Sequence, residues 1–396
     1  MAVVSERHRA PAASPPLPRA PLLLLAGGGF ALLAGLWTGL ARAGVHELFG
    51  PVGAHGLIMA LGFLGTLIAL ERAVALGARW AYTGPAFSGL SVLWLVAGLP
   101  AAGAGVLLTA AGVVVTAVYG VTLSHHYESH LALMMAGAAA WVVAAMLWTA
   151  GWSPVRLAQT LAAFLVLTIV GERLELSRLR MPSAASRRRL VVAAAVFGAG
   201  VATTLVQRPA GLIVAGIGLL AQTAWLARND IARVTIHRPG LPRYAAACLL
   251  AGYGWLAIGG VLWIALGSGV GGWLLHDAAL HAVFLGFAMS MVMGHAPIIL
   301  PAVLRTPLPY RPSAWIPLGL LHASVALRVA ADLAGSAWLR GWAAHGNVTA
   351  LLLFVGVAFL TVRGARRPAA ATFATPARVA QSRANTTPPT TPKMLA

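Results

Sequence analysis

The chain has 396 residues, of which 59% are hydrophobic and 9% are charged. Soluble domains carry roughly a quarter charged residues, so this composition excludes an ordinary soluble protein and indicates a membrane protein. Cys248 is the single cysteine, which excludes disulfides, iron–sulfur clusters and paired-thiolate copper sites within one chain. The sequence contains no phosphate-binding loop, dinucleotide fingerprint or nucleophile elbow.

Apolar stretches long enough to cross a bilayer recur along the whole chain. We count twelve of them, at residues 20–41, 52–76, 84–101, 105–123, 130–150, 154–171, 190–206, 210–227, 243–267, 274–300, 313–334 and 345–363. The sequence therefore predicts an all-α fold, a polytopic membrane helix bundle of about 12 transmembrane helices. Division of the small-residue run at 84–123 is the least constrained.

The net charge of +19 is distributed asymmetrically between the two sides of this arrangement. With the N-terminus inside, the inner segments carry 23 Lys and Arg residues and the outer segments carry 4. Basic residues concentrate in cytoplasmic loops, so the count predicts an N-in, C-in topology in a bacterial plasma membrane. The basic charge is thus explained without nucleic acid, and we expect no nucleic-acid partner.

The two ends differ in composition from the spans. Residues 1–19 and 364–396 are rich in Pro, Ala, Thr and Arg, and we expect them to be disordered cytoplasmic tails. Residues 20–363 are expected to form one twelve-span transmembrane domain.

Span two begins with His55 at the predicted outer surface and ends with Glu71 and Arg72 at the inner surface. An imidazole at the edge of an apolar span is costly unless it binds something, so His55 is a candidate ligand. Glycines surround it and recur in span ten, where they would let a flat macrocycle approach the backbone; they are Gly53, Gly56, Gly62, Gly65, Gly286 and Gly294. Close helix packing explains such glycines equally well.

The connection between spans four and five, SHHYESH, is rich in histidine and places His126 and His130 at the inner surface. Span six ends nearby in VGERLELSR, which puts Glu172 and Glu175 three residues apart on one helical face. The histidines are candidate metal ligands and the glutamates candidate proton-relay or tuning groups. Alternatively, the turn is solvated and the glutamates pair with neighbouring arginines.

Span ten is the most informative segment because it carries His281 near its outer end and His295 near its inner end. Fourteen residues correspond to roughly 1400° of helical turn and roughly 21 Å of rise, so both imidazoles face the same way at two depths. Pro297 and Pro301 follow His295, either freeing carbonyls beside it or marking the end of the span. His276, with its neighbour Asp277, is interpreted as a residue of a solvated loop.

Span eleven contributes His322 near the middle of the membrane, a further candidate metal ligand. Arg328 and Asp332 lie four residues apart on one face nearer the outer side, where the spacing predicts an intrahelical ion pair. Such a pair could tune a bound cofactor or relay protons.

Imidazoles from two helices at one depth suit haem iron, and sets of two or three suit copper. His55 and His281 form the simplest bis-imidazole pair and are the predicted ligands of haem b. Copper is a further candidate, with its ligands drawn from His295, His322, His126 and His130.

At the level of families, the twelve-span layout and the residues of span ten resemble the NnrS family of bacterial haem- and copper-containing membrane proteins. The residues that carry this resemblance are His281, Gly286, Phe287, Met293, Gly294 and His295. The same stretch resembles span ten of subunit I of haem–copper oxidases and nitric oxide reductases. The resemblance implies haem bound by His55 and His281, contact with nitric oxide, and a role in nitrosative-stress response.

The chain departs from these families at two places. The early span reads GAHGLIM with His55 alone, where NnrS proteins usually have a His-Ala-His-Glu-Met-like motif. Spans six and seven lack the copper-binding histidines of the oxidases. Whether the protein is an enzyme is therefore left open, as is its redox partner. The alternatives are a secondary transporter and a non-catalytic respiratory assembly protein without haem.

Overall fold

The computed structural model describes residues 19–45, 50–306 and 309–366, and the chain is helical throughout these ranges, with no strand. The elements in order are α1 (Arg19–Arg42), η1 (Val52–Ala54), α2 (His55–Leu57), η2 (Ile58–Gly65), α3 (Thr66–Leu76), η3 (Arg79–Tyr82), α4 (Thr83–Val96), α5 (Ala101–His125), α6 (Ser129–Thr149), α7 (Pro154–Leu176), η4 (Ser177–Arg180), α8 (Ala184–Thr204), α9 (Arg208–Asn229), α10 (Ala232–Thr235), α11 (Leu241–Gly267), α12 (Trp273–His281), η5 (Ala282–Met289), α13 (Ser290–Leu304), η6 (Pro312–Ala314), α14 (Trp315–Leu333) and α15 (Ala337–Arg366). This confirms the predicted polytopic helical bundle.

Ten of the described helices are long and apolar enough to cross a membrane. They coincide with ten of the twelve predicted spans, so the chain is a multi-pass membrane protein. The other two predicted spans correspond to α4 and α8. Helix α4 has 14 residues, about 21 Å of rise against a hydrocarbon core of about 30 Å. Helix α8 has 21 residues but carries three consecutive arginines, Arg187 to Arg189, near its start.

Two boundaries differ from the prediction. Helix α4 ends at Val96 rather than at residue 101, because Gly98 adopts a left-handed conformation (φ 73°) and Pro100 follows it. Helix α5 consequently begins at Ala101, four residues before its predicted start. The predicted tails, residues 1–19 and 364–396, lie outside the described residues except where α1 begins at Arg19 and α15 continues to Arg366.

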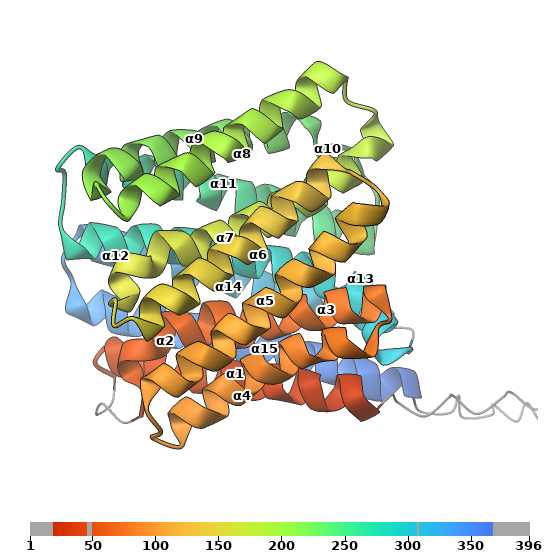
Figure 1. The fold of residues 1–396 in the computed structure, drawn as a ribbon, viewed down its shortest axis with the longest axis horizontal. Helices are drawn as coiled ribbons and strands as arrows, with labels where there is room; N and C mark the ends of the chain where they lie inside the picture. The colour runs from red at the N-terminus through yellow and green to blue at the C-terminus, as the bar shows by residue number, and fades with distance from the viewer. Residues whose placement is uncertain (1–18, 46–49, 307–308, 367–396) are drawn as a thin grey trace, which may run out of the picture.

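The helices run alongside one another, and α7 lies in the middle of the bundle (Figure 1). The bundle buries 83% of the apolar stretch of the span that contains α7, but only 17% of the apolar stretch of α15. Helix α7 is therefore a core helix, while α15 lies at the surface of the bundle with most of its apolar stretch exposed. In Figure 1, α8 and α9 pack together at one edge of the bundle and α1 and α4 at the other.

Spans two and ten each contain an eight-residue π-helical segment, η2 and η5. π-Helical turns are rare and often occur at functional sites. Both segments begin shortly after a candidate ligand, η2 three residues after His55 and η5 directly after His281. Because π turns widen the helix, the straight α-helical count used for His281 and His295 is only approximate here.

Candidate functional site

Span ten lines two separate cavities, one with each of its candidate histidines. The first, called the outer cavity after its predicted side, has a volume of about 200 Å³ and contains His55 and His281. The second, the inner cavity, has a volume of about 120 Å³ and contains His295. Leu64 lines both. The structure thus brings His55 and His281 together, as predicted, and places His295 apart from them.

His55 is held by a contact between two helices. Its Nδ1 lies 3.0 Å from the carbonyl oxygen of Gly35 in α1. A carbonyl can only accept, so Nδ1 carries the proton and Nε2 keeps its lone pair. Gly39, one turn later on α1, packs directly on the ring: a Cβ there would lie 2.9 Å from Cε1 of His55. Helix α1 therefore sets both the tautomer and the orientation of this imidazole.

His281 has the same hydrogen-bonding state. Its Nδ1 lies 2.8 Å from the carbonyl oxygen of Asp277, one turn earlier, and 3.4 Å from the Oδ2 atom of the same residue. Nδ1 is again the donor, so Nε2 of His281 also keeps a free lone pair. Metal-binding histidines commonly donate their second ring N–H to a carbonyl or carboxylate, which fixes the tautomer.

Asp277 is the centre of a buried ion-pair cluster, which sequence reasoning missed. Its Oδ2 accepts a hydrogen bond from Arg328, and Arg340 approaches to 3.9 Å. Arg328 Nε also lies 3.1 Å from Asp332 Oδ2, which confirms the predicted ion pair of span eleven. Arg340 Nε completes the cluster at 3.0 Å from Asp332 Oδ1. The i, i+4 spacing of Asp277 and His281 is the sequence feature that could have indicated that Asp277 faces the same site as His281.

The interpretation of His276 and Asp277 as a solvated loop is wrong. Both residues belong to α12 and are buried. His276 packs against Arg208 of α9, whose Nη2 lies 3.4 Å from both ring nitrogens. The two polar side chains are buried because arginines of other helices pair with them. Composition alone does not distinguish such buried polar residues from solvated ones.

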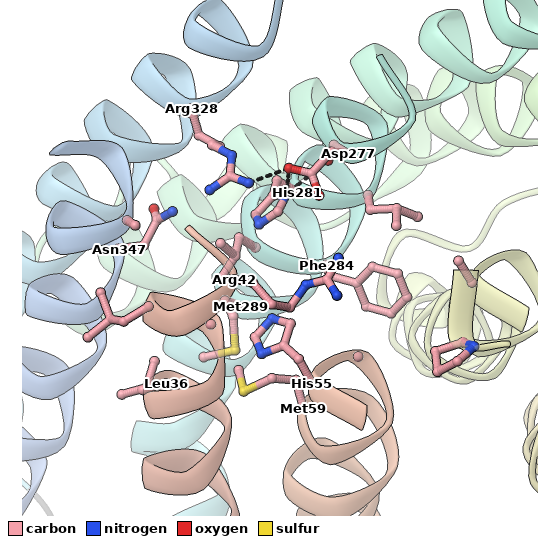
Figure 2. Close-up of a pocket in the computed structure, with 18 of the residues that line it drawn as sticks. Leu36, Arg42, His55, Met59, Asp277, His281, Phe284, Met289, Arg328 and Asn347 are labelled. Atoms are coloured by element: carbon pink, nitrogen blue, oxygen red, sulfur yellow. Dashed lines mark hydrogen bonds and ion pairs between the residues drawn. The ribbon is translucent and has the colours of Figure 1, made fainter. Parts of the chain in front are cut away.

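The lining of the outer cavity combines an apolar body with an excess of positive charge. Three guanidinium groups line it, those of Arg42, Arg328 and Arg340, against the single carboxylate of Asp277. Figure 2 shows His55 and His281 on opposite sides, with the side chain of Arg42 between them in this view. Arg42 forms no ion pair with any residue that the structure describes. The apolar lining includes Leu36, Leu40, Leu64, Phe284, Leu285, Val348 and Leu351.

Open space beside the backbone, which the prediction requires at all six glycines, is present at only two of them. Gly53 and Gly56 line the outer cavity, with open space where a Cβ would stand. The other four are packing glycines, because a Cβ would meet a side chain of the bundle: Val92 at Gly62, Trp141 at Gly65, Trp255 at Gly286 and Cys248 at Gly294.

The inner cavity contains Glu172 beside His295, together with Glu71, which was not among the predicted ligands. His295 Nδ1 lies 2.6 Å from the carbonyl oxygen of Met291, so its Nε2 also keeps a lone pair. Arg72 bridges the carboxylates: it donates to Glu71, and its Nη2 lies 3.4 Å from Glu172 Oε1.

The remaining predicted residues lie outside both cavities. Glu175 turns away from Glu172 towards His130, with 3.8 Å between its Oε2 and the histidine Nε2. Arg178 lies 3.2 Å from His130 Nδ1 and 2.5 Å from Glu128. His126 is exposed where α5 ends. His322 Nδ1 accepts a 2.9 Å hydrogen bond from the indole of Trp255, so the proton of the neutral ring is on Nε2. The one lone pair that this ring could offer a metal is therefore already used.

Among the described residues, the one group of three acidic or imidazole ligands that converges is Asp277, His281 and Asp332. Arg328 and Arg340 already pair with both carboxylates, so this group is an ion-pair cluster rather than a cation site. The predicted copper ligands His126, His130, His295 and His322 do not gather at one point.

A search of curated proteins finds no match for the chain. A family described as Domain of unknown function (DUF8744) matches residues 19–363, which include every described helix that lines the two cavities. This match covers most of the chain, and the protein belongs to that family.

Proposed function

We propose that the outer cavity binds a b-type haem between Nε2 of His55 and Nε2 of His281, and that the protein acts in nitric oxide handling in a bacterial plasma membrane. The observation that carries this proposal is the shared state of the two rings. Each is fixed through Nδ1 by a backbone carbonyl, 3.0 Å and 2.8 Å away, and each leaves its Nε2 lone pair at the same cavity. Neutral imidazoles of this kind are the usual axial ligands of haem iron.

The charges around the cavity also suit haem, which carries an apolar ring and two propionate groups. The apolar side chains would cover the ring. Arg42 has no ion-pair partner among the described residues, and guanidinium groups bind carboxylates through paired hydrogen bonds. Arg42 lies between the imidazoles in Figure 2, so its side chain would move aside to pair with a propionate.

Nitric oxide enters the proposal through the resemblance to NnrS proteins. Held by His55 and His281, a haem would supply one-electron chemistry. Binding of a diatomic ligand would require His55 or His281 to dissociate.

Copper at the same cavity is a second candidate, favoured by one specific observation. The thioethers of Met59 and Met289 line the cavity with the two imidazoles and lie beside His55 in Figure 2. Thioether and imidazole ligands suit Cu(I). A copper site would need no macrocycle and would leave the visible spectrum without haem bands.

The test is the visible spectrum and the haem and copper content of the purified full chain. We expect an intense Soret band, with resolved α and β bands after reduction, and one haem per chain. His55→Ala and His281→Ala should each lose most of this haem, because each removes one axial ligand. His345→Ala is the matched control, since His345 is an exposed outer histidine whose Nδ1 also bonds a backbone carbonyl but which does not line the cavity.

A colourless protein would overturn the haem proposal. Stoichiometric copper in that colourless protein, lost in Met59→Leu and His55→Ala, would support the second candidate instead. Haem that persists in both histidine variants would reject these two residues as ligands.

A further inference from the structure

The inner cavity has no role in the function proposed above, although it contains three ionisable side chains within a membrane-spanning bundle. They come from three helices: Glu71 from α3, Glu172 from α7 and His295 from α13. Intramembrane ionisable groups are costly and mark ligand or proton sites. The chemistry of their free atoms indicates what kind of ligand this cavity accepts.

The polar end of the cavity offers hydrogen-bond acceptors. His295 gives its Nδ1 proton to the carbonyl of Met291, so its Nε2 presents a lone pair. The two carboxylates present oxygens; Nη2 of Arg72 is directed at these carboxylates, its Nε is buried without a partner, and Arg72 does not itself line the cavity. A ligand at this end must therefore donate hydrogen bonds, as a hydroxyl group does.

The charges at this end favour a ligand that can also release protons. With both carboxylates ionised, Glu71, Glu172 and Arg72 would carry one net negative charge beside His295, because the nearby Arg173 is paired with Asp230. A net charge is costly in an apolar bundle, so uptake of a proton stabilises the cluster. A metal ion would have to compete with Arg72 for both carboxylates.

The rest of the cavity is apolar and lies within the membrane-spanning part of the bundle. Its lining includes Leu25, Leu67, Ile68, Leu165, Ile169, Ile299 and Val303. The cavity is partly open, and its volume of about 120 Å³ suits a single small ring. Such a wall excludes strongly hydrated solutes and favours a ligand that is itself dissolved in lipid.

We propose that the inner cavity binds the ring of a lipid-soluble hydroquinone, with its hydroxyl groups directed at His295 and the glutamate pair. In its oxidation to the quinone, both O–H bonds break. One proton goes to Nε2 of His295 and the other to a carboxylate of Glu71 or Glu172. Each of the two electrons reduces one ferric haem to the ferrous state, so one hydroquinone reduces the outer-cavity haems of two chains.

The electron-transfer part of this inference rests on the haem proposed for the outer cavity, and the binding part does not. Leu64 lines both cavities, and α7 and span ten extend along both, so a ligand in one cavity lies beside the wall of the other. The inner cavity would then be the site at which the protein is reduced.

The binding test uses the full chain in lipid nanodiscs and a radiolabelled decyl-hydroquinone, kept reduced under anaerobic conditions, with protein-free nanodiscs as background. We expect one saturable site per chain, with binding of the corresponding quinone at least tenfold weaker because the quinone has no donor. His295→Leu should weaken hydroquinone binding about tenfold, the loss of roughly one hydrogen bond. His295→Gln should restore most of it, since the amide oxygen is an acceptor.

The control variant is His125→Leu, which removes an exposed histidine at the same end of the bundle. It should bind as the unmodified protein does. Photolabelling of the unmodified chain with an azido-hydroquinone, kept reduced under anaerobic conditions, provides a measurement that needs no variant, and it should label residues 64–71, 165–172 or 288–303. Labelling elsewhere, equal binding of both redox forms, or stronger binding of an ammonium with the same tail would overturn the proposal.

Repeating the binding assay on the haem-free His55→Ala variant separates the two proposals. Hydroquinone bound without haem in any preparation would leave the inner site standing while the outer proposal fails. Haem present without hydroquinone binding would give the opposite result. Where both are present, anaerobic addition of decyl-hydroquinone should shift the Soret band to the reduced position, and His295→Leu should slow this shift.

Discussion

At the scale of single residues, the outer cavity depends on a charge cluster in which every member needs the others. Arg328 contacts Asp277 and Asp332, and it is itself buried. Breaking a buried ion pair by removing one partner is costly because it leaves an uncompensated charge. The Asp277 carboxylate also lies 3.4 Å from Nδ1 of His281, whose proton goes to the backbone carbonyl of the same residue, so the cluster borders the proposed ligand.

We predict that Arg328→Met destabilises the fold by about 3–5 kcal/mol, because two carboxylates then share only Arg340. Thermal unfolding of the solubilised protein would measure this loss. Adding Asp332→Asn to the variant should recover part of it, since the two positions are coupled. Arg156→Met removes an exposed outer arginine over Trp152 and should change stability by less than about 1 kcal/mol. Equal unfolding temperatures for Arg328→Met and the unmodified chain would contradict the assigned role of the cluster.

At the scale of helices, α1 acts on the outer cavity through its backbone rather than through a ligand of its own. The Gly35 carbonyl orients His55, and Gly39 leaves room for its ring. Gly29 lies on the same helix with nothing within 4 Å of its would-be Cβ. Alanine at Gly29 adds a methyl group to the helix alone, whereas alanine at Gly39 adds one that also meets the imidazole of His55. Comparing the two substitutions separates these effects.

We predict that Gly39→Ala lowers haem occupancy, because the added Cβ would stand 2.9 Å from Cε1 of His55 and force the ring to turn. Gly29→Ala should leave occupancy unchanged and, if anything, raise stability, since alanine favours a helix by about 1 kcal/mol over glycine. The ratio of haem to protein in the two variants is the measurement. The same occupancy in both would mean that α1 does not position His55.

Sequence reasoning succeeds for features that depend on local pattern and fails for those that depend on neighbouring helices. Hydropathy located the spans, and the i, i+4 rule paired Arg328 with Asp332. The pairing of His55 with His281 came from family resemblance and depth. By contrast, Glu71 joined the inner cavity and Asp277 proved buried only through contacts with other helices. The π turns η2 and η5 likewise have no signature in the apolar pattern that contains them.

At the scale of the whole molecule, the two weakest spans determine which side of the membrane each cavity faces. Helix α4 is short for a bilayer and α8 begins with arginines, yet α4 packs alongside α1 and α5, and α8 alongside α9. Twelve crossings place the 150–153 connection outside and the connection at residues 181–183 inside. If α4 did not cross, the 150–153 connection would lie inside and the connection at residues 181–183 outside.

Single-cysteine labelling decides this directly, because Cys248 is fully buried and gives little background. In a Cys248→Ala background, Ala150→Cys should react with a membrane-impermeant maleimide in intact cells, and Ala184→Cys only after permeabilisation; both positions are exposed. Ser268→Cys, which follows α11, should again react in intact cells if α8 crosses. Reaction of Ala184→Cys but not of Ala150→Cys would place the 150–153 connection, and with it the cavity that Pro154 and Val155 line, on the cytoplasmic side. The His55–His281 cavity would then face the cytoplasm, and the predicted N-in, twelve-span topology would be wrong.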